Sequence, residues 1–301
     1  MPVSLIWIPI VVFGAAFQTA RNALQRALVE TAGPWGATLV RFLFGLPFAF
    51  AWWAAAALIW GVPSSTEFRF MPFVIACLVG ALAQVIATAA LLQSMRKSNF
   101  ALGSFFSQST LPLTAIGGLF VGDLLSWPAA LGVAIATLGL AVVSWPKRIE
   151  GGLRNWSAAR YGVLSGAMFA ISGNAFREGA HAVSMESPFY AAAVAVAIVQ
   201  LMQSAGLIAW LVATDRPALR TALSTWRVSL GAGFCGWAAS ACAFTALAFA
   251  PAAMVRVVAV VDMPMAALAG RGLFLERLTA RQIGGAVLIA CGVIATALGS
   301  L

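Results

Sequence analysis

The segment FGAAFQTARNA, residues 13–23, returns in altered form as SGAMFAISGNA, residues 165–175. The two segments align at an offset of 152 residues, the distance from Asn22 to Asn174. The same offset aligns further identical residues: Gly14 with Gly166, Phe17 with Phe169, Pro112 with Pro264, and Gly132 with Gly284. An offset near half the chain length, held from one end of the chain to the other, indicates an internal duplication.

The composition is that of an integral membrane protein. Of 301 residues, 62% are hydrophobic and 9% are charged, and the mean hydropathy is +0.95. Soluble domains carry about 25% charged residues, so this chain has too few charges to cover a water-facing surface. The net charge of +9 comes from basic residues scattered between apolar runs, which excludes a nucleic-acid interface. The four cysteines and the single His181 lack metal-ligand spacing, so we expect no cofactor.

Ten apolar stretches reach the length of about 20 residues that a membrane-spanning helix needs. They are residues 4–25, 35–60, 72–93, 99–121, 127–146, 157–179, 188–213, 228–249, 252–274 and 280–300. Each repeat, residues 1–150 and 151–301, then holds five spans. Because five is odd, the second repeat enters the membrane from the opposite side. The predicted fold is therefore an all-α polytopic membrane protein of two inverted five-helix repeats, an arrangement found in many secondary transporters.

The segment LFLERLTARQIGGAVLIACGV, residues 273–293, resembles the last loop and span of the drug/metabolite transporter superfamily, in its ten-helix EamA-type branch. The matching positions are Glu276, Thr279, Gln282, Gly285, Ile289 and Gly292, and Leu275 replaces the glycine of that pattern. Pro34 and Arg41 resemble a pair in the branch's second span, where we expect Arg41 to be structural or to contact a loop.

The resemblance implies a multi-pass protein of the bacterial inner membrane that is similar to exporters of aromatic and other neutral amino acids. We expect a monomer whose partners are a small-molecule substrate and the lipid bilayer. Two indications of orientation differ. Lys and Arg gather in the loops after the odd-numbered spans, which by the positive-inside rule places both termini outside. The resembled exporters usually have both termini in the cytoplasm.

Polar side chains inside the expected spans are the candidate substrate-binding residues, because such groups are costly in lipid and usually face a cavity or another helix. They are Gln18, Asn22, Gln84, Ser104, Ser107, Gln108, Asn174, Trp237, Ser240 and Asp262. The alternative is that they only hydrogen-bond between packed helices. Pro112 and Pro264 occupy equivalent spans and are candidate hinges, or else static bends.

The segment MVRVVAVVDMPMA, residues 254–266, places an acid about ten residues into its expected span. Asp262 is therefore the candidate for proton coupling, while Arg256 suits either a substrate carboxylate or a lipid headgroup. The chain lacks a GxxxxGK[ST] motif, so ATP drive is not expected. We expect a secondary transporter, not an enzyme, that exports amino acids or related metabolites by alternating access. An intramembrane enzyme and a channel-like facilitator are the alternatives.

Overall fold

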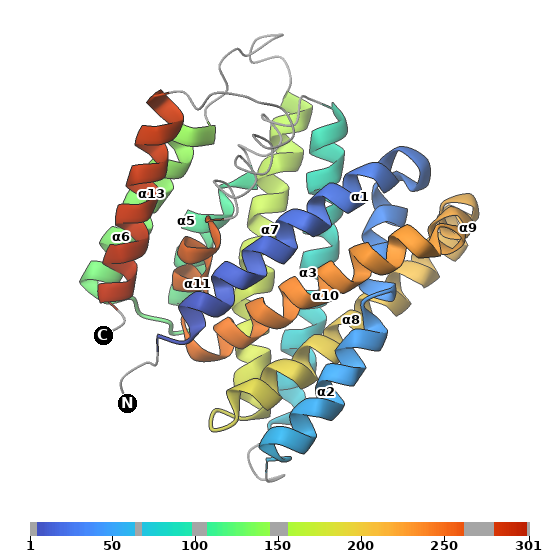
Figure 1. Ribbon diagram of the computed structural model, residues 1–301, viewed down its shortest axis with the longest axis horizontal. Coiled ribbons are helices and arrows are strands. Elements are labelled where there is room, and N and C mark those ends of the chain that lie inside the picture. Colours follow the sequence, from blue (N-terminus) through green and yellow to red (C-terminus); the bar gives the residue numbers. More distant parts are fainter. Residues whose placement is uncertain (1–4, 64–67, 98–106, 145–155, 262–279, 300–301) are drawn as a thin grey trace.

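The computed structural model describes residues 5–63, 68–97, 107–144, 156–261 and 280–299, and every regular element in these ranges is a helix (Figure 1). The helices are α1 (Trp7–Leu43), α2 (Leu46–Trp60), α3 (Phe70–Lys97), α5 (Thr110–Phe120), α6 (Trp127–Ser144), α7 (Trp156–Val183), α8 (Pro188–Thr214), α9 (Arg216–Ser224), α10 (Trp226–Phe249), α11 (Ala252–Ala259) and α13 (Ala280–Leu298). The all-helical class is as the sequence predicts.

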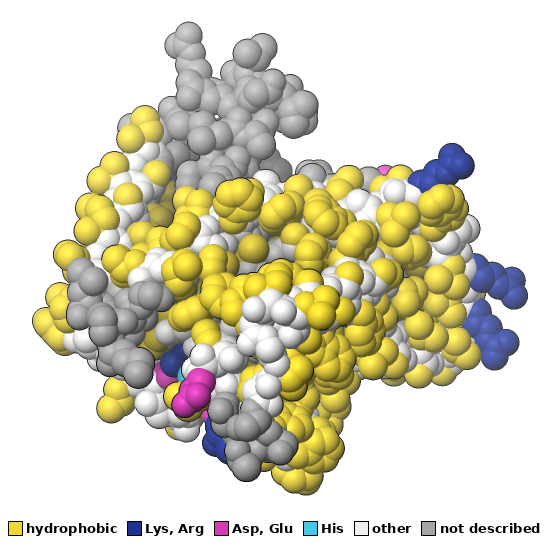
Figure 2. Space-filling model, turned by 60° about the horizontal axis from the view of Figure 1, so that its bottom comes forward, with side chains coloured by type: hydrophobic (Ala, Val, Ile, Leu, Met, Phe, Trp, Pro, Cys, Tyr) yellow, Lys and Arg dark blue, Asp and Glu magenta, His cyan; other side chains and the backbone are white. Residues whose placement is uncertain are grey.

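Four of the described helical stretches are long and apolar enough to cross a membrane. They are Leu28–Trp60, Phe70–Ser94, Pro188–Thr214 and Trp226–Phe249. Shorter apolar helices cover Thr110–Phe120, Trp127–Val143 and Ile283–Leu298. Hydrophobic side chains cover most of the coloured surface in Figure 2, and the charged side chains lie at its right edge and in one small group low on its left half. These features suggest a multi-pass membrane protein.

The first two expected spans differ from the observed helices. The first helical stretch does not end at residue 25 but continues to Gly33, where a φ of 68° and the following Pro34 turn the chain. The second span is interrupted at Phe44–Gly45, between α1 and α2. Pro47 has no N–H and cannot bond the carbonyl of Leu43, so the helical hydrogen-bond pattern is interrupted here although Phe44 and Gly45 keep right-handed helical dihedral angles.

The expected loop at residues 214–227 also contains a helix, α9. Asp215 caps it, because its carboxylate accepts a hydrogen bond from the backbone N–H of Ala218 at 3.0 Å. Pro217 lies in the first turn, where proline is well tolerated. The loop prediction was wrong here because α9 has only nine residues, too few to show as an apolar span.

Three pairs of helices make the most extensive contacts: α1 with α10, α3 with α7, and α6 with α13. In Figure 1, α1 and α10 lie side by side, as do α6 and α13. Glycines allow the close approach. A Cβ atom on Gly132 would lie 2.7 Å from the carbonyl oxygen of Gly292, and one on Gly139 would lie 2.8 Å from that of Gly285. Because the numbers rise along α6 as they fall along α13, these two helices are antiparallel.

Candidate functional site

Most of the candidate residues lie on the long helices. Gln18 and Asn22 lie on α1, Gln84 on α3, and Asn174 on α7, while Trp237 and Ser240 lie on α10. Ser107 and Gln108 lie three and two residues before the start of α5. Ser104, Asp262 and Pro264 lie outside the described residues.

Pro112 lies in the first turn of α5. The carbonyl of Gln108, four residues before it, accepts a hydrogen bond from the N–H of Leu111 at 3.2 Å. The chain turns at Gln108–Ser109, directly before the helix begins at Thr110. The missing N–H of Pro112 thus coincides with a turn that interrupts the expected span. A hinge motion at this turn stays a prediction.

Asn22 and Asn174 align at the 152-residue offset but have different surroundings. Asn22 is exposed, and its Oδ1 accepts a hydrogen bond from Nη2 of Arg21 at 2.7 Å. Asn174 is buried, and its Nδ2 donates to the carbonyls of Thr114 at 3.2 Å and Ala170 at 3.0 Å. The second asparagine therefore joins α7 to α5, which is a packing role.

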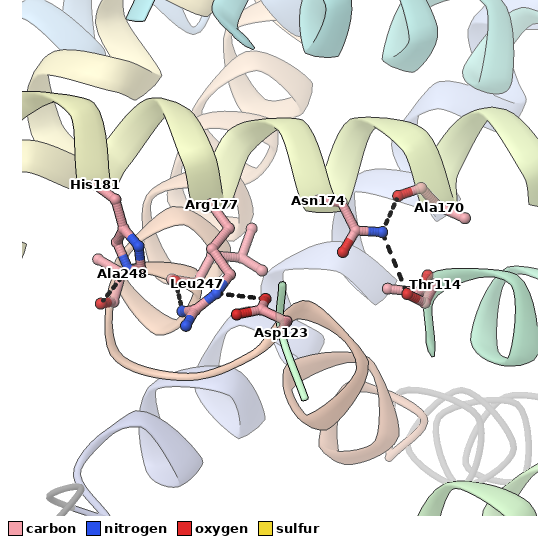
Figure 3. Close-up of polar contacts among 8 residues, drawn as sticks. All are labelled: Thr114, Asp123, Ala170, Asn174, Arg177, His181, Leu247 and Ala248. Atoms are coloured by element: carbon pink, nitrogen blue, oxygen red, sulfur yellow. Dashed lines mark hydrogen bonds and ion pairs between the residues drawn. The ribbon is translucent and has the colours of Figure 1, made fainter. Parts of the chain in front are cut away.

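Figure 3 shows a row of polar side chains on one face of α7: Asn174, Arg177 and His181. Nε of Arg177 approaches Oδ2 of Asp123 to 2.7 Å as an ion pair, although this N–H is not aligned for a hydrogen bond. Nη1 of Arg177 donates to the carbonyl of Leu247 at 2.7 Å. Arg177 thus joins the loop after α5 to the end of α10.

His181 continues this row one turn further. Its Nε2 lies 3.3 Å from the carbonyl oxygen of Ala248. The neighbouring Ala182 accepts a hydrogen bond from the N–H of Arg69 at 2.8 Å, which holds the start of α3 against the end of α7. The α7 row therefore ties several helix ends together, and its charged member has its counterion within the fold.

A second polar group lies between α1, α3 and α8. Nε2 of Gln203 donates to Oε1 of Gln84 at 2.7 Å, across α8 and α3. One turn along α3, the hydroxyl of Thr88 accepts from Nη1 of Arg41 at 3.4 Å. Gln84 and Thr88 share one face of α3, because they are four residues apart.

Gln200 completes this group. It lies one turn before Gln203 on α8, is 2% exposed, and has no hydrogen-bond partner at either Nε2 or Oε1. Its Oε1 lies 3.0 Å from where a Cβ atom on Gly45 would be. Gly45 follows Arg41 by one turn, so Gln200 lies close to the same helical segment as Arg41. We call Arg41, Thr88, Gln84, Gln203 and Gln200 the central polar ring.

Two glycines of α10, Gly233 and Gly236, pack beside the central polar ring. A Cβ atom on Gly236 would lie 2.9 Å from Cγ of Arg41 and 3.6 Å from Cδ of Arg21. One on Gly233 would lie 2.5 Å from the backbone of Phe44. The missing side chains therefore let α10 pack directly against the interruption of α1 and α2, and they bring two arginines together.

Aromatic rings adjoin the same interruption. Phe48, in the first turn of α2, packs against Trp237 at 5.8 Å and Phe234 at 5.2 Å between ring centroids. Phe17 of α1 meets Phe234 edge-on at 6.0 Å. Trp237 is the only one of these that we expected as a binding residue. The site therefore combines hydrogen-bonding groups with an aromatic cluster next to them.

Sequence reasoning missed Gln200, Gln203 and Thr88 as site residues and assigned Arg41 to the scaffold. A signal for the glutamines was present, since both interrupt the apolar stretch at residues 188–214 at a spacing of three residues. The partner of each could not be predicted, because helix packing decides which polar faces meet.

Comparisons with known proteins support the fold alone. No family model and no curated protein sequence matches the chain. Among solved structures, one described only as the crystal structure of a protein aligns with a TM-score of 0.68 at 14% sequence identity. The alignment covers 96% of this chain and 96% of that chain, so the fold of the whole chain is similar to a solved one.

Proposed function

We propose that the protein is a secondary transporter that moves amino acids or related small metabolites by alternating access. The observation that carries the proposal is the central polar ring at an interrupted span. Gln200 is the thirteenth of the 27 residues of α8, and Gly236 is the eleventh of the 24 residues of α10. The polar groups therefore lie near the middle of long apolar helices, where transporters place their sites.

The interruption itself supports the same proposal. Phe44–Gly45 comes ten residues after Pro34, which is about 15 Å along a helix. That depth is about half of an apolar layer of about 30 Å. Helices broken near the midplane are typical of transporter sites, because their free backbone groups can bind a solute.

The helix contacts support inverted repeats. The 152-residue offset from Asn22 to Asn174 carries α1 onto α7 and α3 onto α10. Under this exchange the α1–α10 contact becomes the α7–α3 contact, and the α6–α13 contact becomes itself. These are the three most extensive contacts of the described helices. Two five-helix repeats related by a pseudo-twofold axis would give this pattern.

The proposed family, membrane, direction of transport and cargo follow the expectations from the sequence. The chain would belong to the drug/metabolite transporter superfamily, reside in a bacterial inner membrane and export its substrate. Aromatic and other neutral amino acids are the favoured cargo, because the aromatic cluster adjoins hydrogen-bonding groups. Asp262 remains the proposed residue for proton coupling.

The test is uptake by the purified protein in liposomes. Labelled phenylalanine, leucine and threonine would be offered with and without a pH gradient. We expect saturable uptake that unlabelled substrate competes away, and protein-free liposomes are the control. Unsaturable flux would indicate a channel-like facilitator, and absence of flux for the whole panel would contradict the proposal. An uptake rate that is the same with and without the pH gradient, and the same in the Asp262→Asn variant, would refute proton coupling.

A further inference from the structure

We infer that the central polar ring binds the carboxylate group of the cargo, with Arg41 as the countercharge. The inference rests on the proposed function for its physiological role, but binding can be measured without transport. It assigns to Arg41 a role in recognition in place of the structural role that we expected from the sequence.

The first support is a buried positive charge that contacts the Phe42 ring, at 4.9 Å from Cζ to the ring centroid, but has no acidic partner among the described residues. Arg41 is 4% exposed, and its Nε has no hydrogen-bond partner. Among the described residues no carboxylate lies within ion-pair distance of Arg41, whereas Arg177 has Asp123. Arg21 is close enough for the two positive charges to repel each other. A buried charge needs a partner, and here an incoming anion would supply it.

The second support is Gln200 at the start of α2. Its unpartnered amide lies beside Gly45, the residue that caps α2. Both polar atoms of the Gln200 side chain are without a protein partner, so its amide N–H₂ is available to donate a hydrogen bond. A negatively charged group within the central polar ring would accept this bond and supply the countercharge that Arg41 lacks among the described residues.

The surroundings favour an amino acid among small carboxylates. Oε1 of Gln203 has no hydrogen-bond partner, so it is available to accept a bond from an ammonium group. Phe48 and Trp237 offer aromatic faces next to the same interruption. A molecule with a carboxylate, an amino group and an apolar side chain would use all three features.

The experiment measures binding of labelled L-phenylalanine to the purified full-length protein in detergent, with unlabelled competitors. L-phenylalaninamide lacks the carboxylate, 3-phenylpropionate lacks the amino group, and L-leucine and L-threonine vary the side chain. We expect phenylalanine and 3-phenylpropionate to compete and the amide to be at least tenfold weaker. Equal competition by the amide, or no binding of any carboxylate, would overturn the inference.

Two substitutions test the residues. Arg41→Gln should weaken binding at least tenfold, and the exposed Arg227→Gln should leave it unchanged as a control for lost positive charge. Gln200→Glu would place a permanent carboxylate beside the ring. We expect it to raise the melting temperature and abolish phenylalanine binding, because it supplies the missing countercharge itself. Unchanged binding in both ring variants would overturn the inference. If Arg41→Gln folds poorly, unchanged binding in Gln200→Glu alone would overturn it.

Binding and uptake test the anion site and the transport function separately. Carboxylate-dependent binding without uptake in liposomes would retain the anion site and refute the transporter. Saturable uptake, together with binding that is unchanged in the Arg41 and Gln200 variants, would support the transporter and refute the anion site.

Discussion

Arg177 and Arg41 are similarly buried, at 9% and 4% exposure, but the fold treats them differently. Arg177 has Asp123 at 2.7 Å and the carbonyl of Leu247 at the same distance (Figure 3). Arg41 has the hydroxyl of Thr88 at 3.4 Å and no acid among the described residues. The comparison separates a charge that the fold neutralises from one that it leaves for a ligand.

Their positions agree with this difference. Arg177 lies near the end of α7, among loops that join helices at one end of the molecule. Arg41 lies next to the interruption of a long apolar span, beside the middle of α10. A charge paired near a helix end serves assembly, whereas an unpaired one at depth is costly unless it has a function.

The largest expected effect comes from breaking the pair at Arg177. Asp123→Asn keeps the shape of the side chain but leaves a buried guanidinium without its counterion. We expect a loss of about 3 kcal/mol of stability, the lower end of the range for broken buried pairs. Thermal unfolding in detergent measures it, with the exposed Glu186→Gln as control.

The same measurement on two arginine variants tests the comparison directly. Arg177→Gln should destabilise the protein, because it leaves the Asp123 carboxylate buried alone. Arg41→Gln should leave the melting temperature unchanged or raise it, because no carboxylate loses a partner. Equal destabilisation by both variants would mean that Arg41 is structural after all.

A smaller effect is expected where α10 meets the interruption. Gly233→Ala would place a Cβ atom within 2.5 Å of the Phe44 backbone, so α10 must move away. Overpacking of this kind costs about 1–3 kcal/mol. Gly206→Ala on α8 is the matched control, since a Cβ atom there meets nothing within 4 Å, and alanine favours the helix by up to about 1 kcal/mol. A loss of stability in Gly206→Ala as large as in Gly233→Ala would show that close packing is not the cause.

The smallest expected effect concerns the bond between Gln84 and Gln203. A double-mutant cycle with Gln84→Ala and Gln203→Ala should give a coupling of about 1 kcal/mol. The Thr137→Ala and Gln203→Ala pair is a control, because Thr137 bonds the Val133 carbonyl within its own helix. Additive effects in the first cycle would show that the 2.7 Å contact contributes nothing to stability.

Much of the helix plan was predictable from the sequence. Length and hydropathy place α3, α8 and α10 close to the expected spans, because a span must be long and apolar whatever it packs against. The interruption at Phe44–Gly45 was harder. Pro47 signals it, but the expected span ran through residue 60 without a break. Helix α9 was missed because its nine residues fall below the length that hydropathy detects.

The site was predictable only in part. Gln84 and Trp237 were expected because polar and amphipathic residues within an apolar run are conspicuous. Their partners Gln203 and Phe48 were not, since a sequence shows which face of a helix is polar but not which helix it meets.

The sequence by itself therefore determined an apolar, helical chain, because those properties follow from composition and spacing. Only the tertiary structure decided that Arg177 meets an acid and Arg41 does not. Both are arginines within helical stretches, and their difference arises from segments far apart in the chain. The loop that carries Asp123 reaches Arg177, while the segments that surround Arg41 bring it a hydroxyl and glycines.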